Sequence, residues 1–305
     1  MARKKYPEHP LHPRYWSTWL SIGGLHLCAW LPWSVKIALG KGLGLLALRF
    51  AHERRHFTQV NVRLAFPELT PEQQKEFVRA TFIANGLGLM EVATSLVRKV
   101  DFMKPQVTFK GQEYMDAALA QGKGVLVVGA HFSVLDFGGA LHGLFYPGDA
   151  IYKPHKNPVF DRFIRKGREQ HFDYLVPQKD LKSLVRRIRQ GHAVWYSPDQ
   201  DFGRKVSVFA PFFGVQAASI TMTARIARMT GAPVLPLRMH RNADNRSYTL
   251  EYLPPLDNFP SGDEVADATR VNQVIEQMIR VHPEQYLWMH RRFKTRPNPE
   301  DPSYY

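Results

Sequence analysis

Short apolar runs alternate with amphipathic segments along most of the chain, and this alternation constrains the fold more than any other feature. Apolar runs of strand length predict buried strands, and the segments between them have the spacing of helices. Strands are expected at 124–128, 149–152, 174–176, 193–197, 206–213, 233–240 and 247–253. Helices are expected at 111–120, 132–144, 157–170, 180–190, 217–229 and 264–281. This order predicts an α/β fold, a layered sheet with helices on both faces.

A further helix is predicted ahead of the sheet. Thr70, Pro71 and Gln73 combine a capping residue, a proline at the first helical position and a glutamine that closes a capping box. We expect the helix to run from there toward Leu96.

The first 50 residues have a different character from the rest. Residues 1–14 are basic and contain three prolines, and residues 15–33 are apolar over about the length that enters a bilayer. Four tryptophans and Tyr15 lie toward the two ends of that segment, as in interfacial belts. We therefore expect residues 1–50 to be a basic segment with an N-terminal membrane-anchoring helix, and residues 51–305 to be the working domain. A shallow hairpin and a buried pair of helices are the alternatives.

Composition narrows the classes of partner. The formal net charge of +14 favours anionic partners, such as nucleic acid, anionic lipid or an acidic protein. No zinc-finger, homeodomain, RRM or KH signature is present, which argues against nucleic acid. Cys28 is the only cysteine, so disulfides and cysteine-based metal sites are excluded, and a reducing compartment is expected.

The best candidate for catalysis is His131, which follows the predicted strand at 124–128. Ligands of α/β folds bind at the carboxyl edge of the sheet, where this histidine would lie. Asp136 comes five residues later, and it can reach His131 only if the histidine lies in the loop before the helix. A carboxylate that holds one imidazole nitrogen leaves the other free to act as a base. With 13 histidines and 27 acidic residues, the spacing itself carries little weight.

Residues after the next strands are candidates for substrate binding. Lys153 at a strand end suits a phosphate or carboxylate, and Asn157 is placed to cap the following helix. Arg165 and Arg168 lie on that helix. A capped helix with a solvated face explains the same residues.

Two carboxylates, Asp199 and Asp201, follow the strand at 193–197. They lack further metal ligands at a clear spacing, so we expect no metal and assign them to orienting substrate hydroxyls or neighbouring cations. The basic helix at 179–189 suits an acidic protein or anionic lipid, and a second basic cluster lies at 290–296.

Six sequence blocks are distinctive when taken together. They are His12-Pro-Arg-Tyr-Trp16, residues 61–68, His131 with Asp136, residues 152–158, residues 195–201 and residues 283–297. With these blocks the chain resembles the late acyltransferases of lipid A biosynthesis, the lauroyl/myristoyl type, within the glycerol-3-phosphate acyltransferase-like superfamily. The block at 283–297 is long and specific, and together with the block at 12–16 it points to the lauroyl-type members.

The resemblance implies an enzyme of the inner membrane whose catalytic domain faces the cytoplasm and which needs no cofactor. It would transfer an acyl chain, lauroyl by preference, from acyl carrier protein to a hydroxyacyl chain of Kdo2-lipid IVA. His131 and Asp136 would be the catalytic pair. Backbone N–H groups at the start of the 132–144 helix are expected to stabilise the tetrahedral oxygen.

Three rivals remain. A sister enzyme of the same pathway would transfer a myristoyl or palmitoleoyl chain. A lysophospholipid acyltransferase would share the superfamily, although the sequence at 199–201 differs from the Glu-Gly-Thr that those enzymes tend to carry. A basic, membrane-tethered binding protein would need no catalytic histidine.

Overall fold

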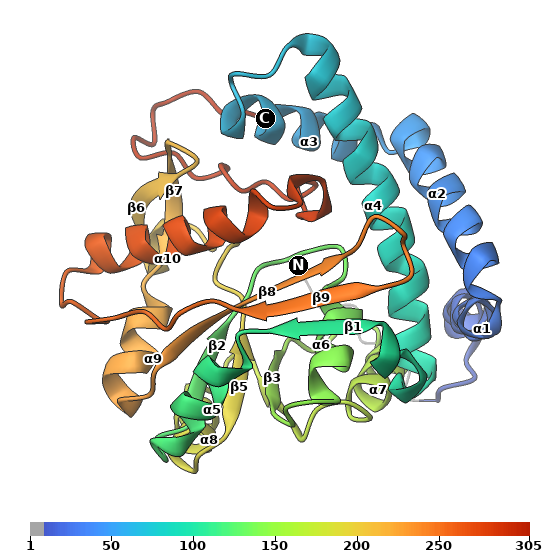
Figure 1. Ribbon diagram of the computed structural model, residues 1–305. Helices are drawn as coiled ribbons and strands as arrows, with labels where there is room; N and C mark the ends of the chain where they lie inside the picture. The colour runs from blue at the N-terminus through green and yellow to red at the C-terminus, as the bar shows by residue number, and fades with distance from the viewer. Residues whose placement is uncertain (1–8) are drawn as a thin grey trace.

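The computed structural model describes residues 9–305, so the first eight residues of the basic segment at 1–14 lie outside the described residues. A seven-stranded sheet forms its centre, in the order β1-β9-β8-β2-β5-β3-β4, beside a two-stranded β6-β7 hairpin (Figure 1). The strands are β1 Val107–Lys110, β2 Val125–Val128, β3 Asp149–Tyr152, β4 Tyr174–Pro177, β5 Ala193–Tyr196, β6 Ser207–Phe212, β7 Val215–Ile220, β8 Val234–Arg241 and β9 Tyr248–Tyr252.

Residues 9–305 contain ten α-helices and four 3₁₀ turns. The α-helices are α1 Trp16–Trp30, α2 Trp33–Phe50, α3 His52–Ala65, α4 Pro71–Val97, α5 Gln112–Ala120, α6 Leu135–Gly143, α7 Pro158–Arg168, α8 Leu181–Arg189, α9 Met222–Thr230 and α10 Glu264–Ile279. The 3₁₀ turns are η1 Pro13–Tyr15, η2 Asp101–Gln106, η3 Arg204–Val206 and η4 Pro283–Gln285.

The sheet is parallel except where β8 and β9 pair antiparallel. β2 lies in its centre and is buried on both faces. Val125 and Val127 contact the core that contains residues of α4, α6 and α10, whereas Leu126 and Val128 contact the core under α8 and α9. Because successive side chains of a strand point to opposite faces, this split confirms the predicted α/β sheet with helices on both faces.

The helix predicted at 217–229 is wrong in its first part. Residues 217–220 belong to β7, and the helix begins only at Met222. Phe213 and Gly214 turn the chain back with φ of 50° and 75°, so that Ala217 and Ala218 pair with β6 and become buried. Tertiary pairing overrides the helical propensity of the alanines. The short edge strand β1 was missed.

The helix predicted from Thr70 is α4, which continues for 27 residues. Its capping box is present: Thr70 Oγ1 accepts from the Gln73 N–H, and Gln73 Oε1 accepts from the Thr70 N–H at 2.8 Å. Among the described residues, α4 is the helix long and apolar enough to cross a membrane, but 67% of its apolar window is buried. We therefore interpret it as a core helix.

The first 50 residues contain two α-helices, whereas we expected one membrane-anchoring helix there. α1 ends at Trp30, and Leu31 and Pro32 are extended before α2 starts at Trp33. Fifteen residues of helix span about 22 Å, which is short of the ~30 Å hydrocarbon core of a bilayer.

Glycines bring α2 into backbone contact with α4, and the two helices run side by side in Figure 1. A Cβ on Gly86 of α4 would lie 2.1 Å from the Gly40 carbonyl oxygen and 2.6 Å from the Gly44 nitrogen. Both neighbours are backbone atoms, so neither can move aside alone. α2 is therefore fixed to α4 by close backbone packing.

We predict that Gly86→Ala destabilises the protein by about 1–3 kcal/mol, because the added methyl must separate the helices. Gly42→Ala is the matched control, since no atom lies within 4 Å of its added Cβ. That change is expected to be neutral or stabilising by up to about 1 kcal/mol through helix propensity. Thermal unfolding in detergent measures both, and equal effects would contradict the packing argument.

Candidate active site

His131 lies in the loop between β2 and α6, three residues beyond the end of β2. The predicted position at the carboxyl edge of the sheet is therefore confirmed. Its side chain keeps 25% of its surface accessible.

Asp199 holds His131 by two hydrogen bonds. His131 Nδ1 lies 2.7 Å from Asp199 Oδ1, and the His131 backbone N–H donates to Asp199 Oδ2 at 2.9 Å. Asp199 stands three residues beyond β5, and β5 pairs with β2 so that Tyr196 lies opposite Val128. Equal offsets from two neighbouring parallel strands bring the histidine and the acid together. A carboxylate at Nδ1 fixes the proton there and leaves Nε2 as a base.

The geometry predicted for Asp136 needs correction, because in the described chain its carboxylate binds Arg168 and not the His131 ring. Arg168 Nη2 and Nε lie 2.6 and 2.7 Å from Asp136 Oδ1. Asp136 is the second residue of α6 and points toward α7. Its negative charge still raises the pKa of His131, so it acts on the ring electrostatically.

We expected free backbone N–H groups at the start of the helix after His131, where they could stabilise the tetrahedral oxygen, and the structure differs from this expectation. The helix begins at Leu135, and the Phe132 and Ser133 N–H groups donate to the carbonyls of Ala130 and Gln285. These two N–H groups are therefore already used within the fold.

A C-terminal segment fastens the His131 loop from the other side. Leu287 N–H donates to the His131 carbonyl at 2.9 Å, and Ser133 N–H donates to the Gln285 carbonyl at 2.7 Å. On its opposite side the loop rests on α4: a Cβ on Gly88 would lie 2.3 Å from the Ser133 carbonyl oxygen. The base is thus clamped between α4 and the segment after α10.

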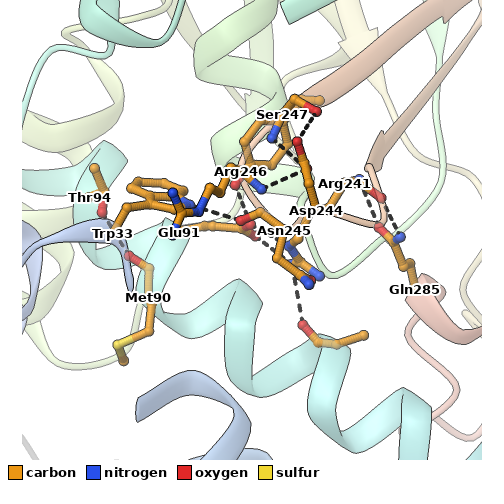
Figure 2. A network of polar contacts seen from close by, with 12 residues as sticks. Trp33, Met90, Glu91, Thr94, Arg241, Asp244, Asn245, Arg246, Ser247 and Gln285 are labelled. Carbon is orange, nitrogen blue, oxygen red and sulfur yellow. Dashed lines mark hydrogen bonds and ion pairs between the residues drawn. The ribbon is translucent and has the colours of Figure 1, made fainter. Parts of the chain in front are cut away.

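Gln285 is in turn held by a buried polar network, shown in Figure 2. Its side-chain amide exchanges two hydrogen bonds with the backbone of Arg241, at 2.9 and 2.8 Å. The Arg241 guanidinium binds the Glu91 carboxylate of α4 at 2.6 and 2.7 Å, and the Tyr248 hydroxyl donates to the same carboxylate. Removing one partner of such a buried pair typically costs about 3–5 kcal/mol, so the support of Gln285 depends on both Glu91 and Arg241.

A pocket of about 230 Å³ opens at His131 and Asp199. Its walls come from α3, from the loop after β5 and from the C-terminal segment. The lining residues are Arg54, Asn61, His131, Asp199, Gln200, Asp201, Tyr286, Leu287, Trp288, His290, Arg291, Arg292 and Lys294. An oriented base that faces an open pocket can take a proton from a bound hydroxyl or water.

Comparison with known proteins agrees with this chemistry. The family model of bacterial lipid A biosynthesis acyltransferases matches residues 3–295. The chain belongs to this family. It is 40% identical to the lipid A biosynthesis lauroyltransferase of Escherichia coli K12, over 96% of each chain. It is 36% identical to the palmitoleoyltransferase of that organism over 98% of each chain, and 27% identical to its myristoyltransferase over 93% of this chain and 89% of the relative.

The lipid A acyltransferase pocket contains only two of the predicted binding residues, Asp199 and Asp201. Lys153 is exposed in the loop after β3, and Arg165 pairs with Glu169 on the surface of α7. Asn157 caps α7 as predicted, and its amide nitrogen donates to Thr18 of α1. Neither Lys153, Asn157, Arg165 nor Arg168 lines this pocket.

Asp201 stabilises the pocket wall. Its carboxylate accepts hydrogen bonds from the Thr295 N–H and hydroxyl and from the Gly203 N–H, at 2.7–2.9 Å. These bonds fix the C-terminal segment against the loop after β5.

Four further residues that line the pocket, Arg54, His290, Arg291 and Lys294, were not predicted as site residues. The sequence identified the last three only as part of the basic cluster at 290–296, and it gave Arg54 no role. The signal for three of them was available, because the block at 283–297 was the most specific in the chain. Its position beside His131 could not be read from the sequence, since it comes from a contact between segments about 160 positions apart. Arg54 had no distinguishing signal.

The electrostatic environment of the His131–Asp199 pair suits a histidine that acts as a general base. Burial lowers the pKa of His131, but the charge of Asp199 and its hydrogen bond raise it by more, so the pKa lies above its usual value. Burial alone would raise the pKa of Asp199, yet the attraction and hydrogen bonds of His131 hold it below its usual value. Burial, followed by repulsion from His131, lowers the pKa of His290.

We predict that Asp199→Asn lowers acyl transfer by about 10²–10⁴-fold, because the imidazole loses its orienting carboxylate. A base works only above its pKa, so wild-type kcat/KM should rise with pH through the raised pKa of His131. Without the Asp199 charge that pKa falls, and the acidic limb of the pH profile should move to lower pH.

Asp136→Asn is the comparison variant. It removes the smaller of the two carboxylate contributions to the pKa of His131 and leaves the Asp199 hydrogen bonds in place. The acidic limb of its kcat/KM profile should therefore shift less than that of Asp199→Asn. A larger shift for Asp136→Asn than for Asp199→Asn would contradict the assignment of Asp199 as the orienting acid.

Proposed function

We propose that the protein transfers a fatty acyl chain, lauroyl by preference, from acyl carrier protein to the hydroxyl of a 3-hydroxyacyl chain of Kdo2-lipid IVA. The observation that carries this proposal is the His131–Asp199 pair in an open pocket of a lipid A acyltransferase. The 40% identity to a lauroyltransferase supports the chain length. The net charge of +14 supports an acidic donor protein and an anionic acceptor.

In the proposed reaction, His131 Nε2 takes the proton of the acceptor hydroxyl while that oxygen attacks the thioester carbonyl. The new C–O bond forms, the tetrahedral intermediate collapses and the C–S bond breaks. The proton on His131 then passes to the departing thiolate. Asp199 stabilises the imidazolium in between. Attack by the acceptor is direct, so the reaction needs no acyl-enzyme and no cofactor.

The second acid, Asp136, is proposed to act through Arg168. The ion pair joins the start of α6 to the end of α7, and the Arg168 guanidinium also lies 5.5 Å from the centre of the Tyr152 ring. We propose that this pair fixes the His131 loop relative to α7. Lys153 and Arg165 are exposed on the α7 side of the molecule, where Asn157 contacts α1, and are proposed to bind anionic lipid headgroups.

We further propose that residues 1–50 hold the enzyme on the cytoplasmic face of the inner membrane. Large apolar side chains of α1 and α2 are exposed, and the most exposed are Leu20, Leu27, Phe50, Trp30 and Trp16. An exposed apolar surface of this kind marks a contact with membrane or protein. The shortness of α1 favours a shallow helical pair over a single crossing.

Transfer of a palmitoleoyl chain is the second candidate, because a palmitoleoyltransferase is almost as similar, at 36% identity. Mass spectrometry of lipid A from cells with and without the protein would distinguish the two by the mass and position of the added chain.

We predict that His131→Ala lowers transfer from acyl carrier protein to Kdo2-lipid IVA by at least about 10³-fold while circular dichroism shows a folded protein. His56→Ala, which changes a surface histidine of α3, should retain activity. Near wild-type turnover by the His131 variant would refute the mechanism. Transfer to a lysophospholipid but not to Kdo2-lipid IVA would refute the proposed acceptor.

Membrane association gives a separate prediction. The double variant Leu20→Ser/Leu27→Ser should bind anionic vesicles at least about tenfold more weakly, because each leucine would lose about 1.5–3 kcal/mol of burial. Leu119→Ser removes an exposed leucine from α5, far from α1 in Figure 1, and should bind as the wild type does. Vesicle flotation measures both, and equal binding by all three proteins would argue against the α1 surface.

A further inference from the structure

Three cations surround the mouth of the pocket, and they come from two distant parts of the chain. Arg54 belongs to α3, whereas Arg291 and Lys294 belong to the C-terminal segment. All three side chains are exposed. Tertiary structure thus gathers positive charge beside the base, in the same hollow as His131.

Three arginines elsewhere in the described chain are neutralised by close carboxylates. In three ion pairs the nitrogen–oxygen distance is 2.6 Å: Arg168–Asp136, Arg187–Asp149 and Arg241–Glu91. These guanidinium groups have their positions fixed within the fold and have little capacity left for a ligand.

The cations at the mouth have weaker contacts. Arg54 donates to the Met289 carbonyl at 3.3 Å, and Arg291 lies 3.4 Å from the exposed carboxylate of Glu53. Lys294 lies 4.0 Å from Asp201, whose oxygens already accept from Thr295 and Gly203. The Arg291–Glu53 pair is long and exposed on both sides, and such pairs contribute little energy. The Lys294–Asp201 pair is at the 4.0 Å limit, and its buried carboxylate is already hydrogen-bonded to other groups. The charges of the three cations therefore remain available for an anion.

A fourth cation, Arg292, lies in the pocket wall and is buried. Its guanidinium donates to the Ala218 carbonyl and to Ser219 Oγ, and its Nε–H has no acceptor within the described residues. Burial lowers the pKa of this arginine, and within residues 9–305 it forms no ion pair. A buried charge and an unsatisfied donor are both costly, and an anion in the adjoining pocket would reduce the cost of the charge.

We infer that Arg54, Arg291 and Lys294, with Arg292 behind them, form a subsite for a phosphate or carboxylate of the substrate. The acidic side chains that line the same pocket, Asp199 and Asp201, are already bonded to His131 and Thr295. Guanidinium groups bind such anions through two parallel hydrogen bonds, which fixes orientation as well as position. The subsite would hold the substrate so that its reacting group meets His131 Nε2.

This inference rests on the proposed function, which offers two sources of such an anion. One is the headgroup of the lipid acceptor, and the other is the phosphodiester of the carrier protein's prosthetic arm. Both present the same chemistry to the cations, and kinetics can tell them apart.

The test is the double variant Arg54→Gln/Arg291→Gln in steady-state acyl transfer. Loss of charge-assisted hydrogen bonds should raise the KM of one substrate at least tenfold and leave kcat within about threefold. A higher KM for the acceptor assigns the anion to the lipid headgroup, and a higher KM for acyl carrier protein assigns it to the prosthetic arm. Unchanged KM values for both substrates would overturn the subsite.

The matched control is Arg225→Gln/Arg228→Gln, which removes two exposed charges from α9, outside the pocket. The control should keep both KM values. If it raises them as much as the pocket variant does, the effect comes from net charge and the subsite is refuted.

Calorimetric titration with inorganic pyrophosphate separates this inference from the proposed function. The wild type and the α9 control should bind pyrophosphate, and the pocket variant should bind it at least tenfold more weakly. The wild type could transfer no acyl chain and still bind pyrophosphate at least tenfold more tightly than the pocket variant. In that case the proposed function fails and the anion subsite stands. If all three proteins bind pyrophosphate equally, the subsite fails whatever the activity.

Discussion

The hydrogen bonds between His131 and Asp199 are the contact on which the site depends. They join the loops that follow two neighbouring parallel strands, so the sheet itself sets the distance between base and acid. Strand pairing is cooperative and buried, and Tyr196 accepts a further bond from the Gly129 N–H just before the histidine loop. The imidazole is therefore aimed by the most rigid part of the fold, which is what a preorganised catalytic group requires.

Polar residues far from the pocket serve the same end. Glu91 and Arg241 form a buried ion pair between α4 and the end of β8, and Gln285 transmits its position to the backbone beside His131 (Figure 2). Sequence inspection gave no reason to single out Glu91 or Arg241, because each is one charged residue among many. Their importance arises from burial, which leaves each of them dependent on the other.

Much of the fold could be predicted from local patterns. The strand before His131, the capping box at Thr70 and the alternation of strands and helices rest on short-range signals, and the structure contains them all. The loops that bear His131 and Asp199 were both identified as sites, but their contact was not. Strand order decides which loops are neighbours, and it depends on pairing between distant segments. Asp136 was favoured as the partner because it is near in sequence, whereas its neighbour in space is Arg168. The hairpin at 207–220 was partly misread for a related reason, since alanines adopt the structure that their neighbours impose.

The glycines of α4 connect two parts of the molecule that a flexible tether would leave independent. Gly86 meets the backbone of α2, and Gly88, half a helical turn further on, meets the backbone of Ser133 beside the base. If α1 and α2 tilted in a lipid layer, α4 and the His131 loop would have to move with them, because both contacts are between backbone atoms. In the proposed membrane-bound state, this packing would set the distance between the His131 imidazole and the lipid acyl chains.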